Sequence, residues 1–413
     1  MGSPLRTLPW LFLAACGAAR EASPTPATPN VERVSEQIIG TRAAGTAPEL
    51  IARGDEALRA SRFADAHASY ATVLEAWRSG SLEAREHEPQ VRLGLAVAQE
   101  GLGQRAEAIQ TYLELERSFG AVAAARQATA RLFSLLAYSE DWKGLGAVAD
   151  RVLATETGAS DFERMAALAA RALARVEQGD DGPAGRDVQQ GLDLMESLRV
   201  GGAGRLPSSA AMLRLAQAEV RRVRSERIEL VAGDGARTSS RDLRDFLPKM
   251  EARCEGLMEA QRSYADAMRA TDPFFIAFGG YRVGEMYRSL HRAIAKIPPP
   301  AKAKSEEDEQ LFFAIMHVRY RVLLEKAHDM MDRTLAMVTP AAAAATTTTT
   351  ATGPNFASWL ERARGLKGEI EAALAEERAF LAALPYDEPT VRRALELMRE
   401  KAERAAEQKA SRR

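Results

Sequence analysis

Apolar residues recur at intervals of three and four positions along most of the chain, and no long stretch alternates between apolar and polar residues. The first spacing places apolar side chains on one face of a helix, whereas alternation is typical of half-buried strands. The apolar residues are rich in alanine and leucine, which lose little freedom in a helix, and aromatic residues make up only 6% of the chain. The pattern therefore predicts an all-α protein.

Two segments carry the same arrangement of a small residue, an alanine twelve positions later and a tyrosine four positions after that. The first segment spans residues 48–80 and the second spans residues 88–119. The three positions are Gly54, Ala66 and Tyr70 in the first segment, and Ala96, Ala108 and Tyr112 in the second. We expect Ala66 and Ala108 to lie where paired helices touch.

This arrangement resembles the tetratricopeptide repeat, whose helices touch at small residues and whose aromatic residue fills the groove toward the next pair. The two copies lie 42 residues apart, against about 34 in the usual repeat, and the polar loop 78–88 accounts for the added length. The resemblance implies a solenoid of antiparallel helix pairs over residues 48–200, with weaker copies at 133–152 and 172–188. A generic helical bundle is the alternative, because alanine at helical spacing is common.

Residues 201–340 are predicted to form a C-terminal region of longer helices that is also tetratricopeptide-like. A glycine-rich break at 201–207 precedes it, and a long amphipathic helix is expected over 306–337. The pattern of small and aromatic residues returns at Ala260, Tyr264 and Ala267.

Asp272 and Pro273 are expected to begin a helix, since aspartate caps helix N-termini and proline suits the first helical position. This helix carries an aromatic stripe, made up of Phe274, Phe275, Phe278 and Tyr281. Aromatic residues at helical spacing indicate core, and a cofactor site is the alternative.

The end of the chain divides into two parts. Residues 341–353 are of low complexity, with runs of alanine and threonine, and are interpreted as an unstructured linker. Residues 354–413 are expected to hold two terminal helices, over 356–384 and 388–407, and a charged tail.

Residues 1–15 resemble a signal peptide. Arg6 precedes an apolar stretch over residues 8–13, which is too short to cross a bilayer. The stretch runs into Leu13, Ala14, Ala15 and Cys16. These four residues resemble the lipobox of bacterial lipoproteins. The resemblance implies that Cys16 carries lipid and becomes the first mature residue, and an ordinary cleavable signal with an incidental cysteine is the alternative.

Residues 16–47 are interpreted as a lipid-anchored tether rich in proline, threonine and alanine, a composition that cannot bury a core. Gly17 stands where an aspartate would favour retention at the inner membrane in the sorting rule for such lipoproteins. The resemblance therefore implies an outer-membrane lipoprotein that faces the periplasm. Acyl chains on Cys16 would make the membrane contact, because two or more chains give stable anchoring.

Cys254 is the only other cysteine in the chain. Its spacing with Met250, Leu257 and Met258 predicts a place on the buried face of a helix. A buried thiol packs as a small apolar group and is a poor nucleophile. A disulfide between Cys254 and Cys16 is the alternative.

The sequence contains no recognisable catalytic or metal-binding motif. Its five histidines show neither His-Glu-x-x-His spacing nor a cysteine partner at metal-ligand spacing, and Gly-x-Ser-x-Gly, Walker-type and Gly-x-Gly-x-x-Gly sequences are absent. His317 and His328 share one predicted helix but lie about three turns apart. We therefore expect no cofactor, no metal and no enzymatic activity. A formal net charge of −1 also provides no basic field for nucleic acid.

A lipid anchor joined to helix pairs resembles the outer-membrane lipoproteins of multi-protein envelope machines. The resemblance implies a non-catalytic protein–protein interaction scaffold whose partners are other envelope proteins. The long C-terminal half exceeds a minimal assembly lipoprotein, which favours a motility- or secretion-type complex. A factor for outer-membrane protein assembly, a regulator of peptidoglycan synthesis and a hydrolase are the alternatives.

The first helices of stacked pairs line a concave face that can hold a partner. Four polar residues of the first two such helices are candidates for partner binding, namely Asp55, Arg59, Arg92 and Glu100. Arginine suits forked contacts with carboxylates, so we expect charge reversal at Arg59 and Arg92 to abolish capture of the partner. Plain exposure to solvent is the alternative at each position.

Overall fold

The computed structural model describes residues 45–120, 122–154, 159–202, 204–230, 238–347 and 357–384, together with six separate positions between 389 and 404. No β-strand occurs among these residues, which hold helices, turns and a single isolated bridge. The predicted all-α fold is therefore confirmed. The signal peptide, the lipobox from Leu13 to Cys16 and most of the tether are predictions that lie outside the described residues.

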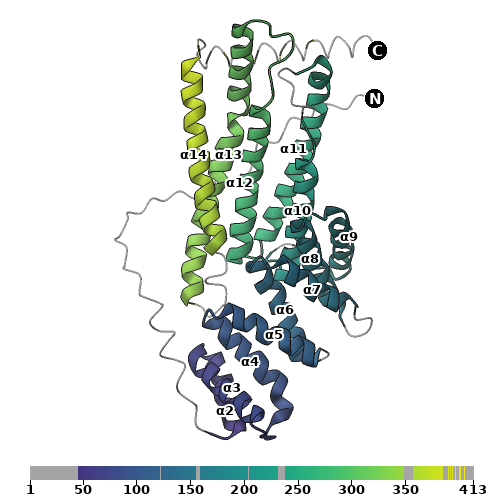
Figure 1. Ribbon diagram of the computed structural model, residues 1–413, viewed down its shortest axis with the longest axis vertical. Coiled ribbons are helices and arrows are strands. Elements are labelled where there is room, and N and C mark those ends of the chain that lie inside the picture. Colours follow the sequence, from purple (N-terminus) through teal and green to yellow (C-terminus); the bar gives the residue numbers. More distant parts are fainter. Residues whose placement is uncertain are drawn as a thin grey trace, which may run out of the picture. The chain divides into compact units, whose positions relative to one another are not determined.

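Four helix pairs form the first part of the described chain (Figure 1). They are α2 (Ala47–Arg59) with α3 (Phe63–Arg78), α4 (Glu88–Gly101) with α5 (Arg105–Phe119), α6 (Ala123–Tyr138) with α7 (Trp142–Ala154), and α8 (Asp161–Glu177) with α9 (Asp181–Ser197). Each helix packs against the next one along the chain. This succession of packed pairs is the helical-repeat arrangement that the sequence predicts.

The small residues of the repeats lie where helices touch. Ala66 and Ala108 are fully buried, as expected. The ring of Tyr70 on α3 lies against the first helices of two successive pairs, because a Cβ atom at Gly54 of α2 would be 2.7 Å from it and one at Gly94 of α4 would be 2.6 Å from it. Both glycines therefore allow a close approach that joins the first pair to the second.

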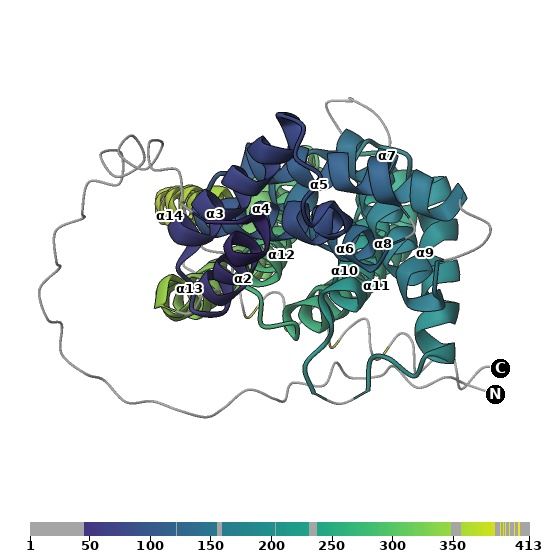
Figure 2. The same cartoon turned by 90° about the horizontal axis from the view of Figure 1, so that it is seen from below.

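Longer helices follow, as predicted. They are α10 (Ser208–Glu226), α11 (Ser240–Met268), α12 (Pro273–Ala295), α13 (Glu306–Thr347) and α14 (Ala357–Ala383). The carboxylate of Asp272 accepts a hydrogen bond from the Phe274 amide at 2.9 Å and so caps α12. Helices α12, α13 and α14 pack against one another, and α10 and α11 lie beside α12 (Figure 2).

The aromatic stripe of α12 belongs to the core. Phe274, Phe275 and Phe278 are almost completely buried. The ring centroid of Phe274 lies 4.5 Å from that of Tyr138 on α6, and the centroid of Phe278 lies 4.3 Å from that of Trp359 on α14. The stripe therefore joins the repeats to the long helices, and the core interpretation is confirmed.

Two details of the C-terminal prediction are wrong. Helix α13 continues to Thr347 and includes residues 341–347 of the predicted linker, because alanine is the strongest helix former. Met258 is 39% exposed, whereas Met250 and Leu257 are buried as expected and Cys254 is half-buried.

Within the described part of the chain, no helix combines the length and the apolar character needed to cross a membrane.

Candidate partner-binding groove

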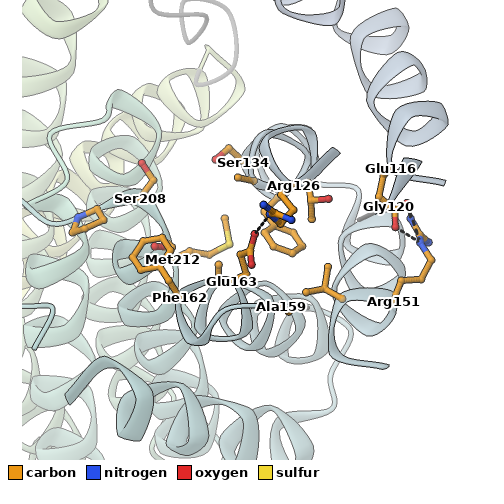
Figure 3. A pocket seen from close by; sticks show the side chains of 17 residues that line it. Glu116, Gly120, Arg126, Ser134, Arg151, Ala159, Phe162, Glu163, Ser208 and Met212 are labelled. Atoms are coloured by element: carbon orange, nitrogen blue, oxygen red, sulfur yellow. Dashed lines mark hydrogen bonds and ion pairs between the residues drawn. The ribbon is translucent and has the colours of Figure 1, made fainter. Parts of the chain in front are cut away.

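A groove of about 590 Å³ opens between the second, third and fourth helix pairs and the start of α10 (Figure 3). Its walls come from α5 to α8 and from the first turn of α10. The lining residues are Glu116, Gly120, Arg126, Thr129, Ala130, Phe133, Ser134, Arg151, Val152, Ala159, Phe162, Glu163, Ala166, Pro207, Ser208, Ser209 and Met212. Ligand pockets in proteins span about 300–1,000 Å³, so the groove can accept several side chains of a partner.

The walls of the groove are mainly apolar. Phe133 and Met212 line the groove and are otherwise buried, whereas Phe162 is 42% exposed. Phe162 lies in the first turn of α8, which begins with a capping box: Ser160 accepts from the Glu163 amide, and the Glu163 carboxylate accepts from the Ser160 amide at 2.8 Å. This cap fixes a large aromatic side chain at the edge of the groove.

Charged side chains of the groove are paired across neighbouring helices. Arg126 of α6 lies 3.3 Å from the Glu163 carboxylate of α8. Arg151 of α7 donates three hydrogen bonds, at 2.8, 3.0 and 3.1 Å, to Glu116 of α5. Figure 3 shows both pairs beside the cavity. Among the lining residues that the structure describes, two positive and two negative charges cancel, so these residues give the groove a mainly apolar surface with paired charges.

The four residues predicted to bind a partner occupy different environments on the first two helix pairs. Arg59 and Asp55 are both exposed, and Asp55 also accepts a hydrogen bond from the Tyr70 hydroxyl at 2.6 Å. Arg92 forms ion pairs with Glu88 at 2.8 Å and with Glu114 at 3.2 Å. The role of these residues in binding stays a prediction.

Glu100 has its carboxylate turned inward. It accepts hydrogen bonds from the Tyr112 hydroxyl at 2.6 Å and from Arg131 at 2.7 Å, and its side chain is only 6% exposed. Burial raises the pKa of the Glu100 carboxyl. This residue therefore holds α4 to α5 and α6, and offers little surface to a partner.

None of the four predicted residues lines the groove, which lies mainly on the third and fourth helix pairs. The sequence contains one local signal for it. Phe162 follows Ser160 and Asp161, at a helix start where the neighbouring residues are polar. Other residues that line the groove, such as Ala130 and Met212, are far apart in the sequence. Only the packing of α6, α8 and α10 brings them together.

The histidines of the long helices are hydrogen-bonded to carboxylates. His291 Nε2 of α12 and His317 Nδ1 of α13 lie 2.6 and 2.9 Å from the same oxygen of Glu377 on α14. His328 Nε2 lies 3.1 Å from Glu371. Over the residues that the structure describes, no group of three histidine, cysteine, aspartate or glutamate side chains is placed to hold a metal ion.

The sequence matches no family model and no curated protein. Among solved structures, the chain is similar to a tetratricopeptide repeat protein from Parabacteroides merdae, with 12% identity and a TM-score of 0.34. The alignment covers 71% of this chain and 98% of that protein. The helical-repeat arrangement of this chain is shown by its own succession of packed helix pairs.

Proposed function

We propose that this protein is a non-catalytic interaction scaffold of the bacterial cell envelope, anchored by lipid on Cys16, and that the groove holds a segment of a partner protein. The observation that carries the proposal is the groove itself. Its apolar walls and the exposed ring of Phe162 form a surface of the kind that marks interaction sites.

The chemistry of the groove selects an uncharged, apolar segment. Arg126 and Arg151 already neutralise Glu163 and Glu116, so an ionic partner would have to displace an existing pair. An apolar segment loses only water, and burial of apolar area contributes about 25 cal/mol per Å². The partner therefore presents apolar side chains that are held between α6, α8 and α10.

The location in the envelope is supported by the sequence that ends at Cys16. Membrane attachment through the tether would leave the helix pairs accessible to periplasmic or outer-membrane proteins. The long helices α11 to α14 add a second structural region beyond the helix pairs. This region supports a place in a multi-protein machine of the motility or secretion type.

Photo-crosslinking in native membranes tests the groove. The photoreactive residue p-benzoylphenylalanine would replace Ala130, which is exposed and lines the groove, and in a control would replace Gln127, which is exposed on the same helix outside it. We expect one discrete protein adduct at position 130 that disappears in the variant Phe162→Asp, with mass spectrometry identifying an apolar peptide. Equal adducts at both positions, or an adduct that survives Phe162→Asp, would contradict the proposal.

A further inference from the structure

Six charged side chains meet between α8, α10 and α12, and we call them the charge cluster. They are Glu177 of α8, Glu219, Arg222 and Glu226 of α10, and Arg282 and Glu285 of α12. Arg282 lies 3.0 Å from Glu177, 3.1 Å from Glu219 and 2.9 Å from Glu285. Arg222 lies 2.6 Å from Glu219 and 2.7 Å from Glu226. Two guanidinium groups therefore serve four carboxylates.

The charge cluster is largely removed from water. Glu219 is completely buried, and the side chains of Glu177 and Arg282 are 12% and 15% exposed. With all six groups ionised, the cluster would carry a net charge of −2, of which the buried Arg253 of α11 offsets a part through its attraction to Glu226. Buried charge without a partner is costly, so this arrangement favours retention of a proton by one of the carboxyls.

Glu177 is the carboxyl that retains the proton most readily. Its burial and the nearby charge of Glu219 raise its pKa to about 7, although Arg282 opposes the shift. Burial also acts on Glu219, but Arg282 and Arg222 outweigh it and hold that pKa below the usual value. The geometry is consistent with these directions, because Glu219 meets both guanidinium groups whereas Glu177 meets that of Arg282.

The other charged groups near the charge cluster do not pair with Glu177 itself. On its own helix, Arg171 and Arg175 bond to Asp187 of α9 at 2.8 and 2.7 Å, and Arg171 also reaches Asp150 of α7. From α11, the Tyr264 hydroxyl donates to Glu219 at 2.6 Å, and Arg253 bonds to the Ile228 carbonyl and attracts Glu226. From α14, Arg362 pairs with Glu140 at 2.9 Å.

Helices α8 and α10 connect the charge cluster to the groove. Phe162 and Ala166, near the start of α8, line the groove, and Glu177 ends the same helix about 22 Å away. On α10, Met212 lines the groove, and Glu219 lies seven residues further on, about 10 Å along the helix. A shift of α8 relative to α10 would therefore change the width of the groove.

We propose that Glu177 is a proton-controlled contact that regulates the groove. With a proton on Glu177, α8 packs against α10, and the groove keeps the form described above. Loss of the proton leaves two like charges, Glu177 of α8 and Glu219 of α10, on the one guanidinium of Arg282, so that α8 separates from α10 and the groove binds its apolar partner less tightly. This regulation rests on the proposed function, since partner binding in the groove is what it controls.

The sign of the pH effect follows from linkage. A carboxyl whose pKa is higher in the folded protein than in the unfolded chain makes the folded protein bind the proton more tightly. For Glu177 the two values are about 7 and 4.5, so the contribution of this residue to stability falls as pH rises between them. Substitution by glutamine keeps a neutral side chain with an oxygen that can accept from Arg282, and so imitates the protonated form.

The test compares the full chain with Glu177→Gln and with the control Glu196→Gln, an exposed glutamate on α9. Thermal unfolding by circular dichroism and binding of the uncharged apolar dye Nile red would be measured from pH 5.5 to 8.5. Phe162→Asp identifies the part of the dye signal that comes from the groove. For the parent and Glu196→Gln we expect a Tm that falls as pH rises to about 7 and levels off above it, and a several-fold loss of dye affinity centred near pH 7. For Glu177→Gln we expect both curves to be much flatter.

The two proposals fail in different ways. If Glu177→Gln shows the same pH dependence as the parent, the proton-controlled contact is overturned. If Tm depends on Glu177 but the dye affinity does not change with pH, regulation of the groove is overturned while the titration stands. If Phe162→Asp leaves dye binding unchanged at every pH, the groove itself is wrong. Should Glu177→Gln fail to fold, NMR titration of the parent with labelled glutamate carboxyls gives the same decision, since a Glu177 carboxyl that titrates near pH 4.5 would overturn the contact.

Discussion

Within the part of the chain that the structure describes, four buried tyrosines donate their hydroxyls to carboxylates. The pairs are Tyr70 with Asp55, Tyr112 with Glu100, Tyr138 with Asp272 and Tyr264 with Glu219, each at 2.6 Å. A buried hydroxyl without a partner costs about 1–3 kcal/mol, and hydrogen bonds to ionised groups are stronger than neutral ones. Asp55 and Glu100 therefore contribute to the joints between helices, which explains why a polar residue on a first helix need not face a partner.

Packing at the repeat alanines leads to a prediction at the scale of single residues. Ala108 of α5 is fully buried, whereas Ala106 on the same helix is exposed. Overpacking a filled core typically costs about 1–3 kcal/mol, so Ala108→Leu should lower the free energy of unfolding by that amount, and Ala66→Leu should behave in the same way. Ala106→Leu is the matched control and should change stability by less than about 0.5 kcal/mol. Equal urea-unfolding midpoints for the two α5 variants would disprove the packing argument.

Lipidation of Cys16 is a second prediction about a single residue. It rests on the sequence from Leu13 to Cys16 and on the thioether chemistry that only a cysteine provides. Expressed with its own signal in a Gram-negative host, the protein should incorporate labelled palmitate and partition into detergent. Cys16→Ser should remove both properties, while Cys254→Ser serves as the control and should keep them. Palmitate incorporation that persists in Cys16→Ser would rule out the anchor.

At the scale of elements, Glu377 ties α14 to α12 and α13. Burial alone would raise its pKa, but hydrogen bonds from His291 and His317 outweigh burial and lower the pKa to about 2. A carboxyl with a lowered pKa stabilises the fold at pH values above 4.5, and this contribution is lost as pH falls toward 2. The contact between the three helices should therefore weaken in acid.

The corresponding experiment measures unfolding of the parent, Glu377→Gln and the control Glu376→Gln between pH 7 and pH 2. Glu376 is exposed and precedes Glu377 on the same helix. We expect Glu377→Gln to be clearly less stable than the parent at neutral pH, and the difference to shrink as pH falls below 4.5. A difference that stays constant over the whole range would mean that Glu377 acts by packing alone.

The elements themselves could be predicted from the sequence, because helix signals are local. The cap at Asp272, the alanine and tyrosine positions of the repeats and the apolar stripe of α12 each depend on residues within one or two turns. The sequence predicts the end of α13 too early. Low complexity alone suggests a linker over the run of alanines, but alanine is a strong helix former and the helix continues to Thr347.

The groove and the charge cluster could not be predicted, because each joins residues from distant parts of the chain. Arg282 lies 105 positions from Glu177, and nothing in either local sequence indicates the other. In the sequence, Arg282 is one charged residue within an aromatic stripe, and Glu177 is an ordinary helix-terminal glutamate. The groove exists only because α5 to α8 pack together with α10, and the charge cluster exists only because α10 packs against both α8 and α12.

At the scale of the whole molecule, two surfaces are candidates for the proposed partner: the groove and the exposed positions of the first helix pair. Arg59 can be reversed to glutamate as a surface change, because it is exposed. Arg92→Glu would instead place a third carboxylate beside Glu88 and Glu114 and would lower stability as well as change the surface. A clean comparison therefore uses Arg59→Glu and Phe162→Asp as single variants.

We expect Phe162→Asp to abolish the crosslink at position 130, because a carboxylate in an apolar groove must be desolvated without a partner when the segment binds. Arg59→Glu should weaken recovery of the same partner only if the bound segment extends from the groove to the first helix pair, and any such effect should diminish at high salt. Both variants should melt within about 1 kcal/mol of the parent, as surface changes do. Full recovery with Phe162→Asp and none with Arg59→Glu, at unchanged stability, would place the binding site on the first helix pair and overturn the groove as the partner's site.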